Sequence, residues 1–111
     1  MKKNSVVAGV FCDVQGTLLD YKGERVNKDI LEMLEKYEKQ GKQIFLWTGG
    51  DPDDFREMIV GLGIEWSILK KYDFRNKIVE IAIDDIPEKK FIADYKIKAQ
   101  TFVFYDTGIW S

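Results

Sequence analysis

Short apolar runs alternate along the chain with segments in which apolar residues recur every three or four positions. Residues 5–12 form an almost unbroken apolar run rich in Val, which is typical of a strand buried on both faces of a parallel sheet. Asn27 precedes a segment with helical spacing that ends near Gly41, so we expect Asn27 to cap a helix there. The apolar residues of that helix are Ile30, Leu31, Leu34 and Tyr37.

The same alternation continues through the rest of the chain. Further strands are predicted at residues 43–47, 64–69, 78–83 and 101–105, and further helices at residues 52–62 and 87–95. Pro52 favours the first turn of the second helix, and Asp51 is suited to cap it. This order predicts an α/β fold with a single doubly wound, Rossmann-like parallel sheet of about five strands. We expect residues 106–111 to form a loose end.

Length and composition indicate one domain and argue against several classes of partner. With 111 residues, 45% of them apolar, the chain can bury one core but not two, so residues 1–111 are expected to form a single domain. The net charge of -2 gives no electrostatic reason to expect nucleic acid or an anionic membrane surface as a partner. Cys12 is the only cysteine and cannot form an internal disulfide, which favours the reducing cytoplasm.

Polar residues of four chemical kinds follow four of the predicted strands. They are Asp13, Thr48, the pair Lys70 and Lys71, and the pair Asp84 and Asp85. Each one alone is most simply a solvated surface group. Because the carboxyl ends of parallel strands share one edge of the sheet, we expect these side chains to gather there. The sequence therefore predicts a site with a nucleophilic acid, a hydroxyl, a cation and two further acids.

The segments that carry these residues resemble the motifs of the haloacid dehalogenase-like (HAD) superfamily. The first motif of the superfamily is Asp-x-Asp-Gly-Thr after the first strand, and here residues 13–17 read Asp-Val-Gln-Gly-Thr. The apolar residues 44–47 followed by Thr48 resemble the second motif, and residues 81–83 followed by Asp84 and Asp85 resemble the fourth. The resemblance covers essentially the whole chain. It implies a HAD-like core without a cap domain, since neither linker that carries a cap in larger members is long enough to hold one.

The resemblance also implies a chemistry, namely phosphoryl transfer to Asp13 assisted by Mg²⁺. The metal would be held by Asp13, the backbone carbonyl of Gln15, and Asp84 or Asp85, and a hard, oxygen-only site of this kind suits Mg²⁺. The phosphoryl oxygens would be bound by Thr48, Gly49 and the lysine of the third motif. That lysine is Lys70, Lys71 or Lys77. Position favours Lys71, because Lys77 precedes the fourth strand and would lie about 20 Å from the site.

Gln15 occupies the place where the motif has its second Asp. An amide can donate or accept a hydrogen bond but cannot transfer a proton. General acid–base catalysis is typically worth about 10² to 10⁴ in rate, so we expect either a slow phosphohydrolase or a degenerate module that binds Mg²⁺ and a phosphorylated ligand or protein. A receiver-like signalling domain is a further alternative, although receivers place their paired acids after the first strand.

The absence of a cap leaves the expected site open to solvent. Such a site suits a phosphorylated small molecule or macromolecule, and a homo-oligomer would cover it. Four aromatic residues would line its rim or, as is commoner at such spacing, belong to the core. They are Trp47, Trp66, Tyr72 and Phe74.

Overall fold

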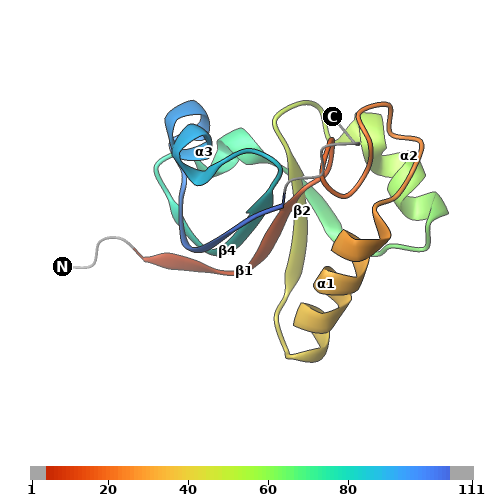
Figure 1. Ribbon diagram of the computed structural model, residues 1–111, viewed down its shortest axis with the longest axis horizontal. Coiled ribbons are helices and arrows are strands. Elements are labelled where there is room, and N and C mark those ends of the chain that lie inside the picture. The colour runs from red at the N-terminus through yellow and green to blue at the C-terminus, as the bar shows by residue number, and fades with distance from the viewer. Residues whose placement is uncertain (1–4, 106–111) are drawn as a thin grey trace.

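The computed structural model describes residues 5–105 and contains one five-stranded parallel sheet (Figure 1). The strand order is β3-β2-β1-β4-β5. The strands are β1 (Val6–Asp13), β2 (Ile44–Thr48), β3 (Ser67–Lys70), β4 (Ile78–Asp84) and β5 (Lys98–Phe104). The helices are α1 (Lys28–Lys39), α2 (Asp53–Gly61) and α3 (Glu88–Tyr95), and a short 3₁₀ helix, η1 (Lys71–Phe74), follows β3. The predicted doubly wound α/β fold is confirmed.

Strand β1 lies at the centre of the sheet, and its register with β2 and β4 determines which residues meet at the carboxyl edge. Asp13 pairs with Trp47 of β2, so Thr48 follows one residue beyond Asp13 at the carboxyl edge. Cys12 pairs with Ile83 of β4, so Asp84 is level with Asp13. This register brings the ends of three strands to one place.

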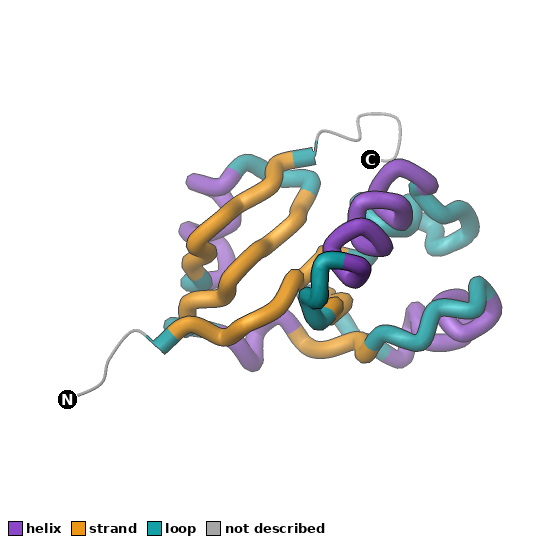
Figure 2. Tube along the Cα trace, turned by 90° about the horizontal axis from the view of Figure 1, so that it is seen from below, coloured by secondary structure: helices purple, strands orange, loops and turns teal. Residues whose placement is uncertain are grey.

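Helices cover both faces of the sheet (Figures 1 and 2). Helices α1 and α2 pack on one face, where Ile30 and Phe55 join Val10 and Cys12 of β1 in a shared core. Helix α3 packs on the other face, where Phe91 contacts a second core around Phe11. Alternate residues of β1 therefore enter opposite cores, which explains why residues 5–12 read as a continuous apolar run.

The helix starts follow the capping residues in the sequence. The side chain of Asn27 accepts hydrogen bonds from the amides of Asp29 and Ile30, as expected for an N-cap. The carboxylate of Asp51 accepts a hydrogen bond of 3.0 Å from the amide of Asp53, the first residue of α2. The cap of α1 is confirmed, whereas α2 begins one residue later than predicted, with Pro52 at its N-cap position.

Two strands begin three residues away from their predicted starts. Strand β3 begins at Ser67 rather than at residue 64, because the Ile64 amide donates to the Ile59 carbonyl and so closes the end of α2. Strand β5 begins at Lys98 rather than at residue 101, since it already pairs with Ile78 at the start of β4. The tail, residues 106–111, lies outside the described residues.

The linkers of the sheet are short. Neither residues 14–27 nor the segment between β2 and β3, which is filled by α2, carries a cap domain, as the sequence predicted. Among residues 5–105, none of the helices has the length and apolar character needed to cross a membrane.

Candidate active site

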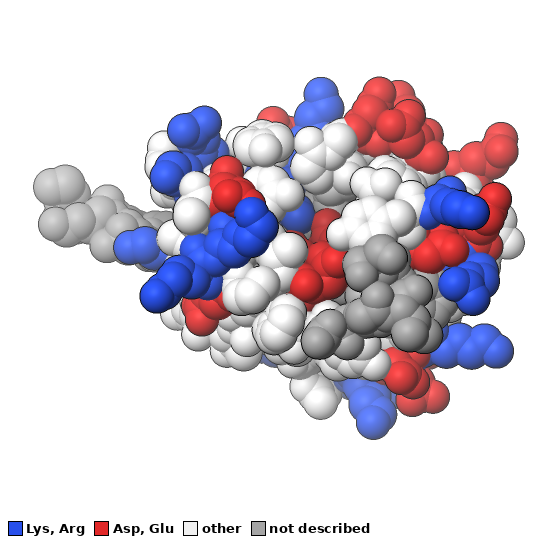
Figure 3. Space-filling model, turned by 45° about the horizontal axis from the view of Figure 1, so that its top comes forward, with Lys and Arg blue, Asp and Glu red and all other residues white. Residues whose placement is uncertain are grey.

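A cavity of about 250 Å³ opens at the carboxyl edge of the sheet. On the face viewed in Figure 3, acidic side chains lie within a hollow that is framed largely by uncharged residues. The residues predicted from the sequence that line the cavity are Asp13, Gln15, Thr48, Gly49, Lys71, Asp84 and Asp85. The strand ends are thus brought together as the topology requires.

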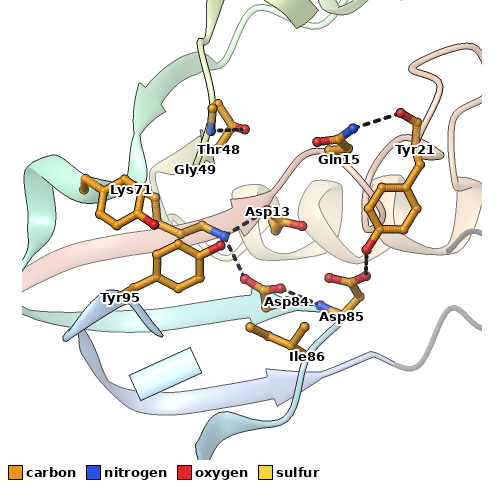
Figure 4. Close-up of a pocket in the computed structure, with 12 residues that line it drawn as sticks. Asp13, Gln15, Tyr21, Thr48, Gly49, Lys71, Asp84, Asp85, Ile86 and Tyr95 are labelled. Atoms are coloured by element: carbon orange, nitrogen blue, oxygen red, sulfur yellow. Dashed lines mark hydrogen bonds and ion pairs between the residues drawn. The ribbon is translucent and has the colours of Figure 1, made fainter. Parts of the chain in front are cut away.

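Lys71 connects two of the acids at the floor of this cavity (Figure 4). Its Nζ lies 2.9 Å from Oδ1 of Asp13 and 3.0 Å from Oδ2 of Asp84, and its side chain is only 2% exposed. Burial by itself would lower the pKa of Lys71, but the charges of Asp13 and Asp84 outweigh it and raise that pKa above its ordinary value. The ammonium group therefore stays charged and ties β1 to β4.

The other two candidate lysines do not line the cavity. Lys70 is exposed at the end of β3, and Lys77 precedes β4 at the opposite edge of the sheet. Position in the structure thus agrees with the preference for Lys71, whose role in catalysis stays a prediction.

Asp13 is buried at the end of β1. Its Oδ1 accepts a hydrogen bond from Lys71, and its Oδ2 accepts one of 2.9 Å from the hydroxyl of Thr17. Burial raises the pKa of Asp13 to about 7; Lys71 opposes the rise and the charge of Asp84 adds to it. The carboxylate is held in one orientation, and its negative charge is costly without further positive charge nearby.

Asp84 and Asp85 complete an acidic cluster with Asp13. A carboxylate oxygen from each lies within 4.8 Å of the others. Oδ1 of Asp84 accepts from the Asp85 amide at 2.8 Å, and Oδ2 of Asp85 accepts from the Tyr21 hydroxyl at 3.2 Å. Burial, with the hydrogen bond and charge of Asp84, raises the pKa of Asp85 to about 6. Three carboxylates near one ammonium group form a donor set that fits a hard divalent cation.

Thr48 and Gly49 form the opposite side of the cavity, where β2 ends. Oγ1 of Thr48 accepts a hydrogen bond of 3.1 Å from the Gly50 amide, and the residue is buried. This bond uses a lone pair of the hydroxyl and leaves its proton to be donated. Thr48 can therefore offer a hydrogen bond to an anion in the cavity.

The side chain of Gln15 is exposed and belongs to the loop after β1 (Figure 4). Its Nε2 donates a hydrogen bond of 2.9 Å to the backbone carbonyl of Tyr21. The next residue, Gly16, has φ +87°, and a Cβ there would lie 2.8 Å from both Oδ2 of Asp85 and Cζ of Tyr21. Only glycine fits this position without displacing the acidic cluster.

Four residues that line the cavity were not predicted from the sequence, namely Tyr21, Gly50, Ile86 and Tyr95. Tyr21 is part of a loop and Tyr95 ends α3, so no strand-end pattern could indicate them.

The idea of an aromatic rim holds only in part. Tyr72 lines the cavity, whereas Trp47 is fully buried in the core. Phe74 packs against the same core, and Trp66 lies elsewhere and donates a hydrogen bond to Glu38.

Comparison with known proteins agrees with the fold and the site. A family model described as haloacid dehalogenase-like hydrolase matches residues 10–106. The chain therefore belongs to the haloacid dehalogenase-like hydrolases, as the motifs at Asp13, Thr48 and Asp84 predicted. No curated protein and no solved structure gives a significant match.

Proposed function

We propose that this protein is a Mg²⁺-dependent phosphohydrolase that acts through an aspartyl-phosphate on Asp13. The observation that carries the proposal is the position of Lys71, whose Nζ lies between Asp13 and Asp84 on the floor of the cavity. A buried lysine between two acids orients the nucleophile and supplies positive charge where a phosphoryl group would enter. Membership of a hydrolase family supports the same reaction class.

Each residue of the cavity has a distinct task in this reaction. A carboxylate oxygen of Asp13 forms a bond to phosphorus while the bond from phosphorus to the ester oxygen breaks, and the leaving oxygen then takes a proton from solvent water. Water next attacks the aspartyl-phosphate, which releases inorganic phosphate and restores Asp13. Thr48 and the Gly49 amide, which line the cavity, would donate hydrogen bonds to the phosphoryl oxygens, and Lys71 would neutralise part of their charge.

The acidic cluster fits Mg²⁺ by its donors. Asp13, Asp84 and Asp85 would hold the ion together with the backbone carbonyl of Gln15, which is available whatever the side chain at that position. Bound Mg²⁺ would supply positive charge that offsets the repulsion between these carboxylates and a phosphate. Burial is the main cause of the raised pKa values of Asp13 and Asp85, and the charge of Asp84 adds to it. A bound divalent cation would offset both effects, which supports this assignment.

Gln15 makes turnover slow under this proposal. Its amide cannot give a proton to the leaving group or take one from water, and the loss is worth about 10² to 10⁴ in rate. Substrates whose leaving group departs without protonation should therefore react best.

A second candidate function is a catalytically degenerate module that binds Mg²⁺ and a phosphorylated ligand or protein. It is favoured by the hydrogen bond from Gln15 to the Tyr21 carbonyl. In this bond the Gln15 amide stabilises the loop, and no proton-transfer group stands at this position of the cavity. In both functions the ligand is a phosphorylated small molecule or macromolecule, and the open cavity leaves room for a partner or a second copy of the chain to cover it. The cytoplasm is the expected location for either.

One assay separates the two candidates. Mg²⁺-dependent hydrolysis of an aryl phosphate is measured for the native protein, for Asp13→Asn and for Gln15→Asp. Native turnover that Asp13→Asn abolishes supports the enzyme, whereas an inert native protein that gains activity as Gln15→Asp supports the degenerate module. Absence of Mg²⁺ binding by the native protein would overturn both.

A further inference from the structure

We propose that the hydroxyl group of Tyr95 is an additional phosphate-binding donor of the cavity, beside Thr48 and Lys71. The inference rests on the proposed function, because it concerns the phosphoryl group that the same cavity would bind. Tyr95 belongs to none of the strand-end motifs, and it reaches the cavity from the end of α3.

The ring of Tyr95 is fixed by its neighbours. Nζ of Lys71 lies 4.3 Å from the ring centroid, a cation–π contact on one face of the ring. Phe91 and Tyr72 pack around it, with centroids 5.5 Å and 5.3 Å away. A ring held in this way has little rotamer freedom left to lose on ligand binding, so its hydroxyl is preorganised.

The hydroxyl of Tyr95 lies against the loop that follows β2. A Cβ placed on Gly49 would be 3.2 Å from this oxygen, so the hydroxyl lies close to the residue that follows Thr48. Figure 4 shows the ring of Tyr95 beside the ammonium group of Lys71, with its hydroxyl end on the side nearer Asp13. The Thr48 hydroxyl, the Lys71 ammonium group and the Tyr95 hydroxyl thus surround one part of the cavity.

The Tyr95 hydroxyl makes no hydrogen bond with any side chain or backbone group in the described part of the chain, residues 5–105. It is half-buried, and burial raises its pKa, so the phenol keeps its proton at neutral pH. A half-buried donor without a protein acceptor that lies beside an ammonium group can donate its hydrogen bond to an anion. A phosphoryl group, with three peripheral oxygens, offers one acceptor for each of the three surrounding donors.

The turn after α3 holds Tyr95 in place. Lys96 adopts the left-handed conformation with φ 60°, and its carbonyl accepts a hydrogen bond of 2.7 Å from the Asn76 amide. The end of α3 is therefore attached to the segment between η1 and β4. Tyr95, the residue before Lys96, is thereby held near the segment that begins with Lys71.

The test compares variants that remove one oxygen atom each. Tyr95→Phe keeps the ring beneath Lys71 and removes the hydroxyl, while Tyr37→Phe removes a hydroxyl from α1, away from the cavity. Binding of inorganic phosphate in the presence of Mg²⁺ is measured by calorimetry, together with KM for an aryl phosphate where turnover is detectable. We expect Tyr95→Phe to weaken phosphate binding by about 10-fold, as for loss of one hydrogen bond to a charged group, and Tyr37→Phe to leave it unchanged.

The outcomes are distinct. Tyr95→Leu removes the ring as well and should weaken binding further. Phosphate affinity of Tyr95→Phe equal to that of the native protein would overturn the inference and leave the proposed function standing, even if Tyr95→Leu is impaired, because the ring alone would then matter. Failure of the native protein to bind phosphate with Mg²⁺ would overturn both. Equal melting temperatures of native protein and Tyr95→Phe show that a lower affinity is not a loss of folding.

Discussion

The side-chain amide of Gln15 lies 2.9 Å from the backbone carbonyl of Tyr21 and donates a hydrogen bond to it, while the hydroxyl of Tyr21 donates to Asp85 (Figure 4). A carboxylate at position 15 could not donate this bond. Gln15 therefore does more than remove a proton-transfer group, because it connects the loop after β1 to a residue that contacts the acidic cluster.

We expect Gln15→Ala to lower the free energy of unfolding by about 0.5–1 kcal/mol, the worth of one hydrogen bond in an exposed loop. Gln43→Ala is the matched control. Gln43 is exposed and precedes β2, at the edge of the sheet opposite the cavity. Urea denaturation of the two variants measures the difference. Equal free energies of unfolding for the two would mean that the bond to Tyr21 contributes nothing to the loop.

Lys71→Met should be far more damaging to stability. It removes the positive partner of two buried carboxylates, Asp13 and Asp84, and breaking such a buried pair typically costs about 3–5 kcal/mol. The measurement is denaturant unfolding in EDTA, so that no divalent ion replaces the ammonium group. We expect added Mg²⁺ to restore part of the loss.

Lys90→Met is the control for Lys71→Met. Lys90 pairs with Asp94 at 2.9 Å on the exposed face of α3, where solvent screens the interaction. The control should unfold like the native protein. A small effect of Lys71→Met, similar to that of Lys90→Met, would contradict the view that Lys71 neutralises the cluster.

Most of the fold could be predicted from the sequence because strands and helices follow from short, repeating patterns of apolar and capping residues. Apolar runs indicated the strands, Asn27 and Asp51 marked the helix starts, and the parallel topology placed Asp13 beside Asp84. The start of β3 was missed because Ile64 is apolar and buried whether it belongs to a strand or to the end of α2.

The candidate site was predictable where it lies at strand ends and not elsewhere. Lys71 could be preferred over Lys77 because, in a parallel sheet, a residue that follows a strand and a residue that precedes one lie at opposite edges. Tyr21 and Tyr95 could not be found, since a loop residue and the last residue of a helix reach the cavity only through the path of the chain. The bond from Gln15 to a backbone carbonyl likewise depends on loop geometry that no residue pattern specifies.

The metal-free protein should lose stability as the pH rises from about 4 to 7. The ordinary pKa of an aspartic acid side chain is 3.8, and the pKa of Asp13 in the folded protein is about 7, so between these values the native state binds more protons than the unfolded state. Each increase in pH therefore lowers the free energy of unfolding, and the full loss of stability is reached above pH 7. Asp85, with a folded-state pKa of about 6, acts in the same direction.

The measurement for this pH dependence is the difference in free energy of unfolding between Asp13→Asn and the native protein in EDTA. Asn cannot ionise, so the variant gains relative to the native protein as the pH rises through this range. Taking the difference cancels the titration of exposed carboxylates common to both proteins. A difference that is constant from about pH 4 to 9 would show that burial does not raise the pKa of Asp13.

Mg²⁺ and beryllofluoride, a phosphate mimic, should raise Tm together and more than either does alone. A ligand that binds only the native state stabilises it by about 2.7 kcal/mol at 100 times its Kd. Asp85→Asn removes one of the three carboxylates of the cluster and should reduce the shift with Mg²⁺, whereas Asp54→Asn, an exposed acid of α2, should keep it. Thermal scans at about pH 7.5 with millimolar ligand decide the matter, because the acids of the cluster are then largely ionised. An equal rise in Tm with Mg²⁺ in both variants would place the metal outside the cluster. If Mg²⁺ does not raise the Tm of the native protein, the cluster is not a metal site.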